Sequence, residues 1–367
     1  MKIGLVREIK SEEYRVGLTP DSASEYIGHG HEVTVETKAG EGSGFTDAEY
    51  QAVGCRITAD KHKLFTDSDM IIKVKEPLTE EFNYFTTGQI LYTYLHLAAN
   101  RELTEMLLEK KINAIAYETV MEKDGSLPLL MPMSQIAGRL AIQEGAKYLE
   151  KSFGGRGILL GGVPGIRKGK VVIIGGGIAG VNAAKMAIGL GADVTIMDIS
   201  ARRLQEIDDI FGSHIKTLFS TRYNILEELA SADLVIGAVL IPGAATPRLI
   251  RRQDLKIMKP GAVIVDIAID QGGCAETSRP TSHKKPTFVV DGIVHYCVAN
   301  MPGAVSLSST MALTSVTNKY GLLIADHGLA GALKLSKPLI AGLNCCSGKL
   351  TNAKVAEALE LEYTLWK

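Results

Sequence analysis

A glycine-rich turn between a strand-like run and a helix-like run most constrains the fold of this 367-residue chain. The apolar run Lys170–Ile174 leads directly into Gly175, Gly177 and Gly180, which are spaced as G-x-G-x-x-G, and a helical pattern follows over residues 181–190. In a parallel α/β sheet, such glycines permit a tight turn, close approach of the backbone to a pyrophosphate, and close helix–strand packing. The amino terminus of the helix attracts the anionic phosphates. This segment therefore predicts a dinucleotide-binding domain.

The next strand-like run indicates which dinucleotide is bound. It covers residues 193–197 and ends at Asp198, 18 residues after Gly180. A carboxylate at this point accepts hydrogen bonds from ribose hydroxyls and repels a 2′-phosphate, which favours NAD over NADP. Arg202 and Arg203 follow closely and weaken this preference, because their side chains can reach a phosphate. NAD is the cofactor that we expect.

Short β-rich runs alternate with longer helical patterns along most of the chain, as in sheets of parallel strands. We expect an α/β protein with two Rossmann-like doubly wound domains and a cleft between them, where small molecules commonly bind. The expected strands before the glycine motif are residues 2–6, 32–36, 70–74, 90–95 and 113–117, and those after it are 193–197, 233–239, 262–267 and 287–290.

The domain boundaries follow from changes in this pattern. A long amphipathic helix is expected over residues 131–151, and the second series of strands ends near residue 300. The helical pattern that follows is too short for a third sheet domain, so we expect it to return to the first. The prediction is a substrate and catalytic domain of residues 1–130 and 303–367, with an NAD-binding domain of residues 131–302 inserted into it.

Charge and composition argue against several kinds of partner. The 40 basic and 41 acidic side chains give a net charge of −1, so nothing general favours nucleic acid or an anionic membrane as partner. No run reaches the roughly 18 apolar residues that span a bilayer, and the amino terminus lacks the pattern of a secretory signal. The five cysteines show no Cys-x-x-Cys spacing. We therefore expect reduced, buried thiols and a cytoplasmic protein.

Charged residues at the ends of strand-like runs indicate a second candidate site. Arg15 lies in the loop after the first run, Lys75 and His96 end later runs of the first domain, and Asp270 follows residues 262–267. Ligands of open parallel sheets bind beyond the carboxyl ends of the strands, so we expect these side chains to converge on one cleft. Arginine and lysine suit a carboxylate or oxo group, histidine titrates near neutral pH, and aspartate can order water. Together they suit hydride transfer at a carbon next to a carboxylate.

Each of the four residues also has an ordinary structural explanation. Arg15 and Lys75 are equally well explained as solvated charges, and His96 as a partly buried histidine with satisfied hydrogen bonds. Asp270 precedes Gly272 and suits a helix cap or a turn. These residue types alone leave both explanations open.

Short strings along the whole chain also carry a resemblance to a known family. They follow one another in the family's order: Gly17-Leu18-Thr19-Pro20, Lys73-Val74-Lys75-Glu76-Pro77, Leu95-His96-Leu97-Ala98, Met131-Pro132-Met133-Ser134, the glycine motif, Asp266-Ile267-Ala268-Ile269-Asp270-Gln271-Gly272-Gly273 and Asn300-Met301-Pro302-Gly303. Over essentially its full length the sequence resembles the bacterial alanine dehydrogenases. The resemblance implies reversible, NAD-dependent oxidative deamination of L-alanine to pyruvate and ammonium, by a homo-oligomer that is usually a hexamer.

The resemblance also implies roles for individual residues. Arg15 and Lys75 would bind the substrate carboxylate and oxo group, while His96 would donate or accept a proton and Asp270 would be the second catalytic residue. Some relatives have a magnesium site near the late helix, but Leu323 stands one turn before His327 where a carboxylate is expected, so we predict no metal. The expected cofactor contacts are Ser134, Gly175, Gly177, Ile178, Ala179, Gly180, Asp198, Arg203, Ser220, Val239, Leu240, Ile267, Ala268, Ile269, Asp270, Val298, Ala299, Asn300 and Met301.

Other assignments share part of this pattern. The nucleotide-binding subunit of proton-translocating transhydrogenase resembles this fold, but it would be an NAD(H)-binding module without amino-acid chemistry. That relative lacks counterparts of His96 and Asp270 and continues towards membrane segments, whereas this chain has both residues and we expect no span. A lysine- or saccharopine-type dehydrogenase, or one for another small amino acid, would keep the reaction and change the substrate. A 2-hydroxy-acid dehydrogenase would share the two-domain cleft.

Overall fold

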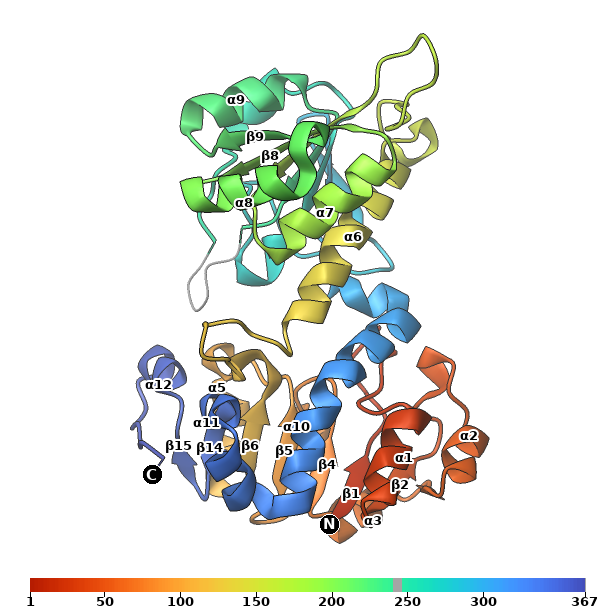
Figure 1. The fold of residues 1–367 in the computed structure, drawn as a ribbon, viewed down its shortest axis with the longest axis vertical. Helices are drawn as coiled ribbons and strands as arrows, with labels where there is room; N and C mark the ends of the chain where they lie inside the picture. The colour runs from red at the N-terminus through yellow and green to blue at the C-terminus, as the bar shows by residue number, and fades with distance from the viewer. Residues whose placement is uncertain (240–245, 367) are drawn as a thin grey trace. The chain divides into compact units, whose positions relative to one another are not determined.

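The chain forms two compact units, which are described here from a computed structural model covering residues 1–239 and 246–366. Unit 1 consists of Met1–Met133 and Gly303–Lys367, and unit 2 of Ser134–Pro302. Each unit contains one mostly parallel β-sheet with helices packed on it (Figure 1). The chain leaves unit 1 within α6 (Met131–Tyr148) and returns to it within the 3-10 helix η8 (Met301–Val305). The α/β architecture expected from the alternating pattern is confirmed.

Unit 1 is built on an eight-stranded sheet with the order β15-β14-β6-β5-β4-β1-β2-β3. Neighbouring strands from β3 to β6 are parallel, whereas β14 is antiparallel to both β6 and β15. The C-terminal segment thus completes the first sheet with two strands, where the sequence pattern indicates only helices. The strands are β1 (Lys2–Leu5), β2 (Glu32–Glu36), β3 (Arg56–Thr58), β4 (Met70–Ile72), β5 (Ile90–Thr93), β6 (Asn113–Ala116), β14 (Leu343–Cys346) and β15 (Lys349–Leu350).

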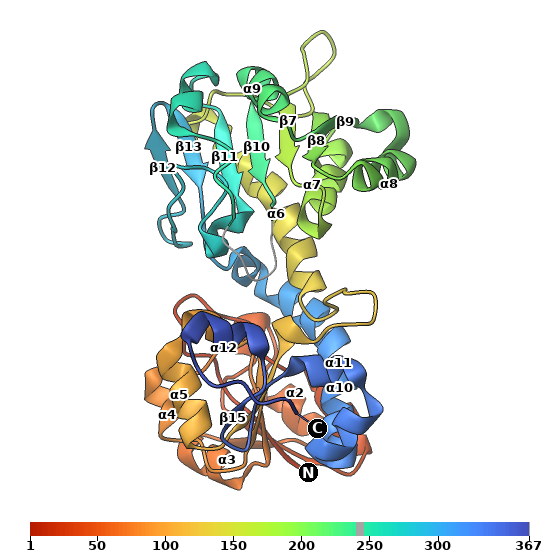
Figure 2. The same ribbon diagram turned by 90° about the vertical axis from the view of Figure 1, so that its left-hand side faces the viewer.

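Helices lie on both sides of this sheet, and Figure 2 shows α10 and α11 on the side opposite to α3, α4 and α5. Helix α1 begins at Pro20, where the Thr19 hydroxyl oxygen accepts the Ser22 N–H at 3.1 Å and proline loses no needed donor. The helices are α1 (Pro20–Gly28), α2 (Asp47–Ala52), α3 (Lys61–Asp67), α4 (Thr79–Phe82), α5 (Arg101–Glu109), α10 (Ser306–Leu335), α11 (Lys337–Gly342) and α12 (Ala353–Leu359).

Unit 2 has a seven-stranded sheet with the order β12-β13-β11-β10-β7-β8-β9. The chain runs outward from β7 through β8 to β9 and then crosses to β10 on the other side of β7, so the strand order reverses between β7 and β10. Ligands of doubly wound sheets bind beside such a reversal, outside the carboxyl ends of the strands. The antiparallel β12 lies at the edge beside β13. The strands are β7 (Lys170–Ile174), β8 (Asp193–Asp198), β9 (Lys216–Phe219), β10 (Leu234–Gly237), β11 (Val263–Asp266), β12 (Thr287–Val290) and β13 (Ile293–Tyr296).

Buried aliphatic strands form the core of unit 2, because both faces of its sheet carry helices. Val171–Ile174 of β7 and Leu234–Ile236 of β10 have no exposed surface, as expected for central parallel strands. The helices after α6 are α7 (Ile178–Gly189), α8 (Ala201–Phe211) and α9 (Arg222–Ser231). Within the described parts of both units, no helix has the length and apolarity needed to cross a membrane.

Candidate functional site

The glycine motif forms the turn from β7 into α7, and Gly175 and Gly180 each have a conformational or steric reason to be there. Gly175 has a φ of 107°, a conformation that residues with side chains rarely adopt. A Cβ on Gly180 would lie 1.9 Å from the Gly175 carbonyl oxygen, so only glycine lets α7 start this close to the strand. Gly177 caps α7, and a Cβ there would meet nothing within 4 Å. The backbone is therefore uncovered at Gly177, where the amino end of α7 can accept a pyrophosphate.

Asp198 and Arg203 hold this turn from the neighbouring strand and helix. The Asp198 carboxylate accepts the Gly176 N–H at 2.8 Å with one oxygen and the Ser200 N–H at 2.9 Å with the other. The Nε of Arg203 donates to the Gly176 carbonyl oxygen at 2.6 Å. The sequence pattern suggests only contacts to ribose or phosphate for these residues. The structure adds that they fix the backbone of Gly176.

Helix α6 packs against the first turn of α7. A Cβ on Gly138 of α6 would come within 2.1 Å of the Ala179 carbonyl oxygen, so the two backbones touch. Arg139 Nε also donates to Asn182 Oδ1 at 3.1 Å. Ser134, the predicted cofactor contact on α6, lies one turn before Gly138 and therefore near the start of α7.

Most other predicted cofactor contacts of unit 2 follow the carboxyl ends of its strands. The Ser220 N–H, just after β9, donates to the Asp198 carbonyl oxygen at 3.0 Å. Val239 follows β10, and its nitrogen would lie 3.0 Å from a Cβ on Gly175. Ile267, Ala268, Ile269 and Asp270 form the 3-10 helix η7 (Ile267–Gln271) after β11, and Val298, Ala299, Asn300 and Met301 follow β13. Leu240 lies outside the described residues.

These observations test whether the chain fits NAD. The turn leaves an uncovered backbone at Gly177 at the amino end of a 12-residue helix. Asp198 stands beside that turn, where the carboxylate of a Rossmann domain meets the ribose hydroxyls. The glycine turn, the helix terminus and the acid all fit the adenosine diphosphate half of the cofactor.

In unit 1, Arg15 is buried in a tight ion pair with Glu13. The Glu13 carboxylate accepts hydrogen bonds from Arg15 Nε at 2.6 Å and from Nη2 at 2.5 Å, and the two side chains are 2% and 0% exposed. Arg15 Nη1 also lies 3.1 Å from the Met133 sulfur. Burial lowers the pKa of Arg15, but Glu13 outweighs it and the net direction is upward. Arg15 is therefore a buried, permanently charged group and not a solvated one.

Lys75 is a second cation near Arg15. Burial and the Arg15 charge lower its pKa, and no ion pair to its Nζ occurs among residues 1–239 and 246–366. Its backbone N–H and that of Val74 donate to one oxygen of Glu8, at 3.2 and 2.6 Å. The other Glu8 oxygen lies 3.3 Å from Nζ of the fully buried Lys73. A carboxylate thus holds the end of this strand, while the Lys75 ammonium has no ion pair in the described part of the chain.

His96 is presented by strained backbone at the end of β5. Its φ of 51° is positive, which is uncommon for a residue with a side chain. Glu118 holds this conformation, because its carboxylate accepts the His96 N–H at 2.7 Å and the Leu95 N–H at 3.2 Å. The imidazole is exposed and stacks on Tyr94, with ring centroids 6.1 Å apart. Tyr94 interacts electrostatically with Arg15, so Arg15, Lys75 and His96 belong to one neighbourhood of unit 1.

Asp270 lies in unit 2, on the exposed side of η7. The buried carboxylate nearby is Asp266 at the end of β11, whose Oδ2 accepts the N–H of Cys274 at 2.8 Å and the Ser278 hydroxyl at 2.6 Å. Asp266 therefore fixes the loop after η7, and the Asp270 side chain faces solvent.

Several of these supporting residues are missed by sequence reasoning. Glu8, Glu13 and Glu118 read as ordinary surface acids in a single sequence. Only Lys73 carries a signal: it is a charge in the middle of an otherwise apolar run, and such a charge needs a buried partner. Among the described residues no cluster of three or more histidine, cysteine or acidic side chains has the arrangement of a metal site.

The fold and the glycine turn define a dinucleotide-binding α/β protein, and comparison with known proteins identifies its family. Residues 4–137 match the N-terminal domain of the alanine dehydrogenase/PNT family, and residues 141–353 match its C-terminal domain. The chain is 55% identical to alanine dehydrogenase of Halomonas elongata and to alanine dehydrogenase 2 of Staphylococcus aureus, over 99% of this chain and 98% of each relative. The chain belongs to the alanine dehydrogenase/PNT family.

Solved structures agree with this result. The fold matches an L-alanine dehydrogenase with a TM-score of 0.95 and 49% identity, covering 98% of this chain and 99% of that one. A transhydrogenase from Sinorhizobium meliloti matches with a TM-score of 0.83 at 23% identity, over 96% of this chain and 99% of that one, which shows a shared fold. The expected activity, that of an NAD-dependent alanine dehydrogenase, is confirmed by the full-length similarity.

The buried ion pair leads to a test of stability. Glu13→Gln should lower the free energy of unfolding by roughly 3–5 kcal/mol, because Arg15 would keep a buried charge without its partner. Glu105→Gln is the matched control, since it breaks the Arg101–Glu105 pair, whose side chains are 50% and 56% exposed, and it should cost less than about 1 kcal/mol. Urea unfolding followed by circular dichroism measures both. Equal losses in the two variants would contradict the importance of the buried pair.

Proposed function

We propose that Arg15, Lys75, His96 and Asp270 carry out the oxidative deamination of L-alanine to pyruvate and ammonium, and the reverse reaction. The observation that carries this assignment is the charge arrangement of unit 1. Arg15 is neutralised by Glu13, and Lys73 by Glu8 and Glu81, whereas the nearby Lys75 ammonium has no ion-pair partner in the described chain. One partly buried ammonium without an ion pair in the described chain, beside a guanidinium, suits a single carboxylate.

Arg15 and Lys75 would bind the carboxylate and the oxo group of the substrate. Glu13 accepts hydrogen bonds from Nε and Nη2 of the guanidinium, which fixes the orientation in which Arg15 would meet a substrate carboxylate. The Lys75 ammonium would bind the same carboxylate or the oxygen that develops at Cα, where its charge stabilises the oxyanion character. Binding an anion there also relieves the repulsion between the two cations.

His96 and Asp270 would handle water and protons. When bound, NAD supplies the acceptor for the hydride that leaves Cα of alanine with a neutral amino group. Water then adds to the carbon of the substrate iminium, and the His96 imidazole accepts the proton that this water loses. The proton then returns to the carbinolamine nitrogen, and the C–N bond breaks as the C=O bond forms. The hydroxyl proton that is released converts the leaving ammonia to ammonium, which gives pyruvate and ammonium. The Asp270 carboxylate would order the water and balance the cationic iminium.

The remaining assignments are proposals of the same kind. Residues 1–130 and 303–367 would be the substrate and catalytic domain, and residues 131–302 the NAD-binding domain with the contacts named above. Absence of a catalytic metal and a cytoplasmic location stay predictions.

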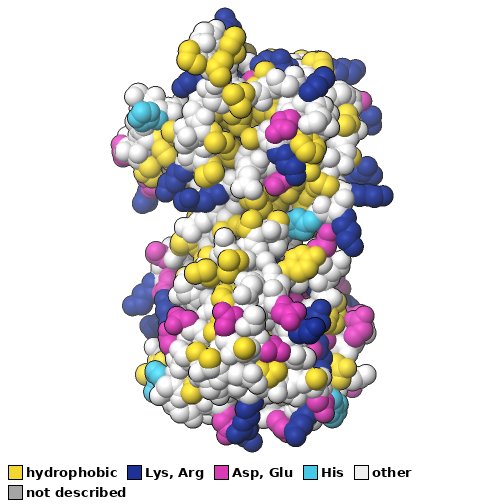
Figure 3. All heavy atoms as spheres, turned by 90° about the vertical axis from the view of Figure 1, so that its right-hand side faces the viewer, with side chains coloured by type: hydrophobic (Ala, Val, Ile, Leu, Met, Phe, Trp, Pro, Cys, Tyr) yellow, Lys and Arg dark blue, Asp and Glu magenta, His cyan; other side chains and the backbone are white. Residues whose placement is uncertain are grey.

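A homo-oligomer, and specifically a hexamer, is also proposed from the family resemblance. An apolar loop supports association of copies: Leu159, Val163 and Ile166, which precede β7, are all exposed. Figure 3 shows apolar side chains gathered on one face of unit 2. Exposed apolar groups of this kind commonly mark contacts with other chains.

The proposed reaction is tested by NADH formation with a panel of amino acids. L-Alanine should be oxidised, and 2-hydroxy acids should not. His96→Ala should lower kcat at least about 100-fold, the size of a general acid–base contribution, while the dissociation constant of NADH changes less than about twofold. His62→Ala, which removes another exposed histidine of unit 1, serves as control. Near-normal turnover in His96→Ala would show that the assigned role is wrong.

Asp198 is tested through cofactor preference. Asp198→Asn keeps an oxygen that can accept the Gly176 N–H but removes the charge that repels a 2′-phosphate. We expect the ratio of kcat/KM for NADP to that for NAD to rise at least about tenfold, an effect of roughly 1.4 kcal/mol. The control is Asp193→Asn at the exposed start of β8. An unchanged ratio in Asp198→Asn would contradict the assignment.

The lowered pKa of Lys75 predicts the pH dependence of substrate binding. A bound carboxylate stabilises the ammonium form, so binding is strongest while Lys75 is protonated. Affinity for pyruvate should fall by about tenfold per pH unit above the pKa of Lys75 in the NADH complex, which should lie below that of an ordinary lysine. Calorimetric titration of pyruvate with NADH present measures this. Lys75→Arg keeps its charge at alkaline pH, so persistence of the fall in that variant would exclude Lys75 as its source.

A further inference from the structure

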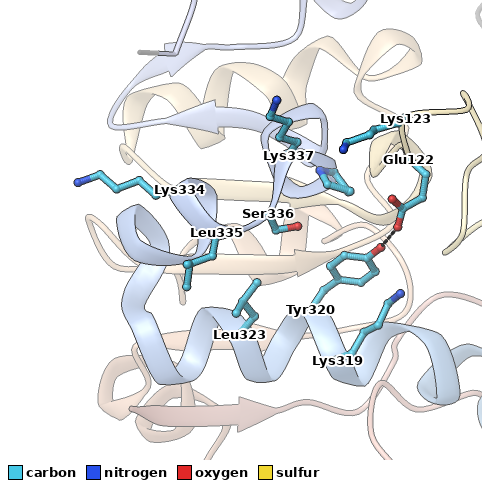
Figure 4. A pocket seen from close by; sticks show the side chains of 10 residues that line it. Glu122, Lys123, Lys319, Tyr320, Leu323, Lys334, Leu335, Ser336 and Lys337 are labelled. Atoms are coloured by element: carbon cyan, nitrogen blue, oxygen red, sulfur yellow. Dashed lines mark hydrogen bonds between the residues drawn. The ribbon is translucent and has the colours of Figure 1, made fainter.

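Unit 1 has a pocket of about 530 Å³ that contains none of the residues assigned above to the reaction or the cofactor. Its walls come from residues 122–123, from residues 319–335 of α10 and from the turn between α10 and α11. The volume is in the range of small-molecule pockets. Four lysines line it, namely Lys123, Lys319, Lys334 and Lys337, together with one acidic residue (Figure 4).

The charges of these lysines are not balanced within the described residues, where none of the four has an ion pair. All four lysines are exposed residues. The acidic lining residue, Glu122, accepts a hydrogen bond from the Tyr320 hydroxyl at 2.6 Å. Four ammonium groups against one carboxylate leave a formal charge of +3 around the pocket.

The side chains in Figure 4 are arranged around one side of the pocket. Lys123, Lys319 and Lys337 border the space in front of Ser336 and Tyr320, and Lys334 is directed away from it. Lys319 Nζ lies 4.5 Å from the centroid of the Tyr320 ring, which keeps that ammonium at the pocket wall. The Ser336 side chain makes no capping hydrogen bond to α11, so its hydroxyl can serve a ligand.

We propose that this pocket binds a small organic phosphate. Its cations are all lysines, compact point charges that suit phosphate oxygens in any orientation. The Ser336 hydroxyl adds a donor to the same oxygens. The apolar residues Leu323, Leu335 and Pro338 complete the lining, and they would contact the organic part of the ligand.

Calorimetric titration with phenyl phosphate tests this proposal on the full chain. NADH is kept saturating throughout, so that the glycine turn is occupied, and ionic strength is held constant with potassium chloride. The triple variant Lys123→Gln, Lys319→Gln, Lys337→Gln should bind phenyl phosphate at least tenfold more weakly than the parent. The triple variant Lys63→Gln, Lys349→Gln, Lys354→Gln makes the same charge change at exposed lysines of unit 1, and its affinity should stay within twofold of the parent.

Two further probes separate the parts of the proposal. Inorganic phosphate should bind more weakly than phenyl phosphate, because it lacks a group for the apolar wall, and benzoate should bind more weakly because it lacks the phosphoryl charge. The proposal is overturned if the parent binds benzoate as tightly as phenyl phosphate, or if both triple variants lose affinity equally. Neither result would bear on the dehydrogenase reaction, since no pocket residue is assigned a role in it, and both triple variants should keep the parent rate of alanine oxidation.

Discussion

Burying positive charge at the carboxyl edge of a sheet is the constraint on which unit 1 depends. A buried cation is costly unless a carboxylate is paired with it and hydrogen-bonded. Arg15 is paired with Glu13 through two short hydrogen bonds, and Lys73 with Glu8 and Glu81. Once these charges are balanced, Lys75 is the cation beside Arg15 without an ion pair in the described chain. A carboxylate substrate would supply the missing negative charge.

The two units would bind anions through different groups. Backbone N–H groups are available at the first turn of the sheet in unit 2, whereas in unit 1 they already donate to a carboxylate. In unit 2 the turn after β7 leaves the backbone at Gly177 uncovered, so N–H groups at the start of α7 can donate to a pyrophosphate. In unit 1 the Glu8 carboxylate, which follows β1, already accepts the N–H groups of Val74 and Lys75. An anion at that edge must therefore be bound by side chains. This difference explains why one unit has a glycine motif and the other has arginine and lysine.

Local signals made much of the fold predictable. The glycine turn was expected because it depends on residues a few positions apart, and the Thr19-Pro20 start of α1 and the Thr46–Glu49 capping box of α2 are local signals of the same kind. Strand β14 was not predicted, because its four residues are defined by pairing with β6, more than two hundred positions earlier. Helix α10 is interrupted at Gly328, whose φ of 66° and ψ of 167° are not helical, so the residues before and after it form two helical segments.

The residues of the candidate site also differ in whether the sequence predicts them. Arg15, Lys75 and His96 could be selected because each follows a strand, and the topology of parallel sheets says what such positions do. Their partners could not be selected from the sequence. Glu13 resembles an ordinary surface acid, and Glu118, which accepts the His96 N–H, lies 22 positions away in the sequence. Whether a lysine has a structural role or binds a ligand is equally uncertain from sequence until the carboxylates around it are known. Lys73, Lys75 and Lys337 are chemically identical, yet the first is enclosed by two glutamates and the other two have no ion pair in the described chain. The two glutamates around Lys73 thus identify it as a structural ammonium, which its place in the sequence does not show.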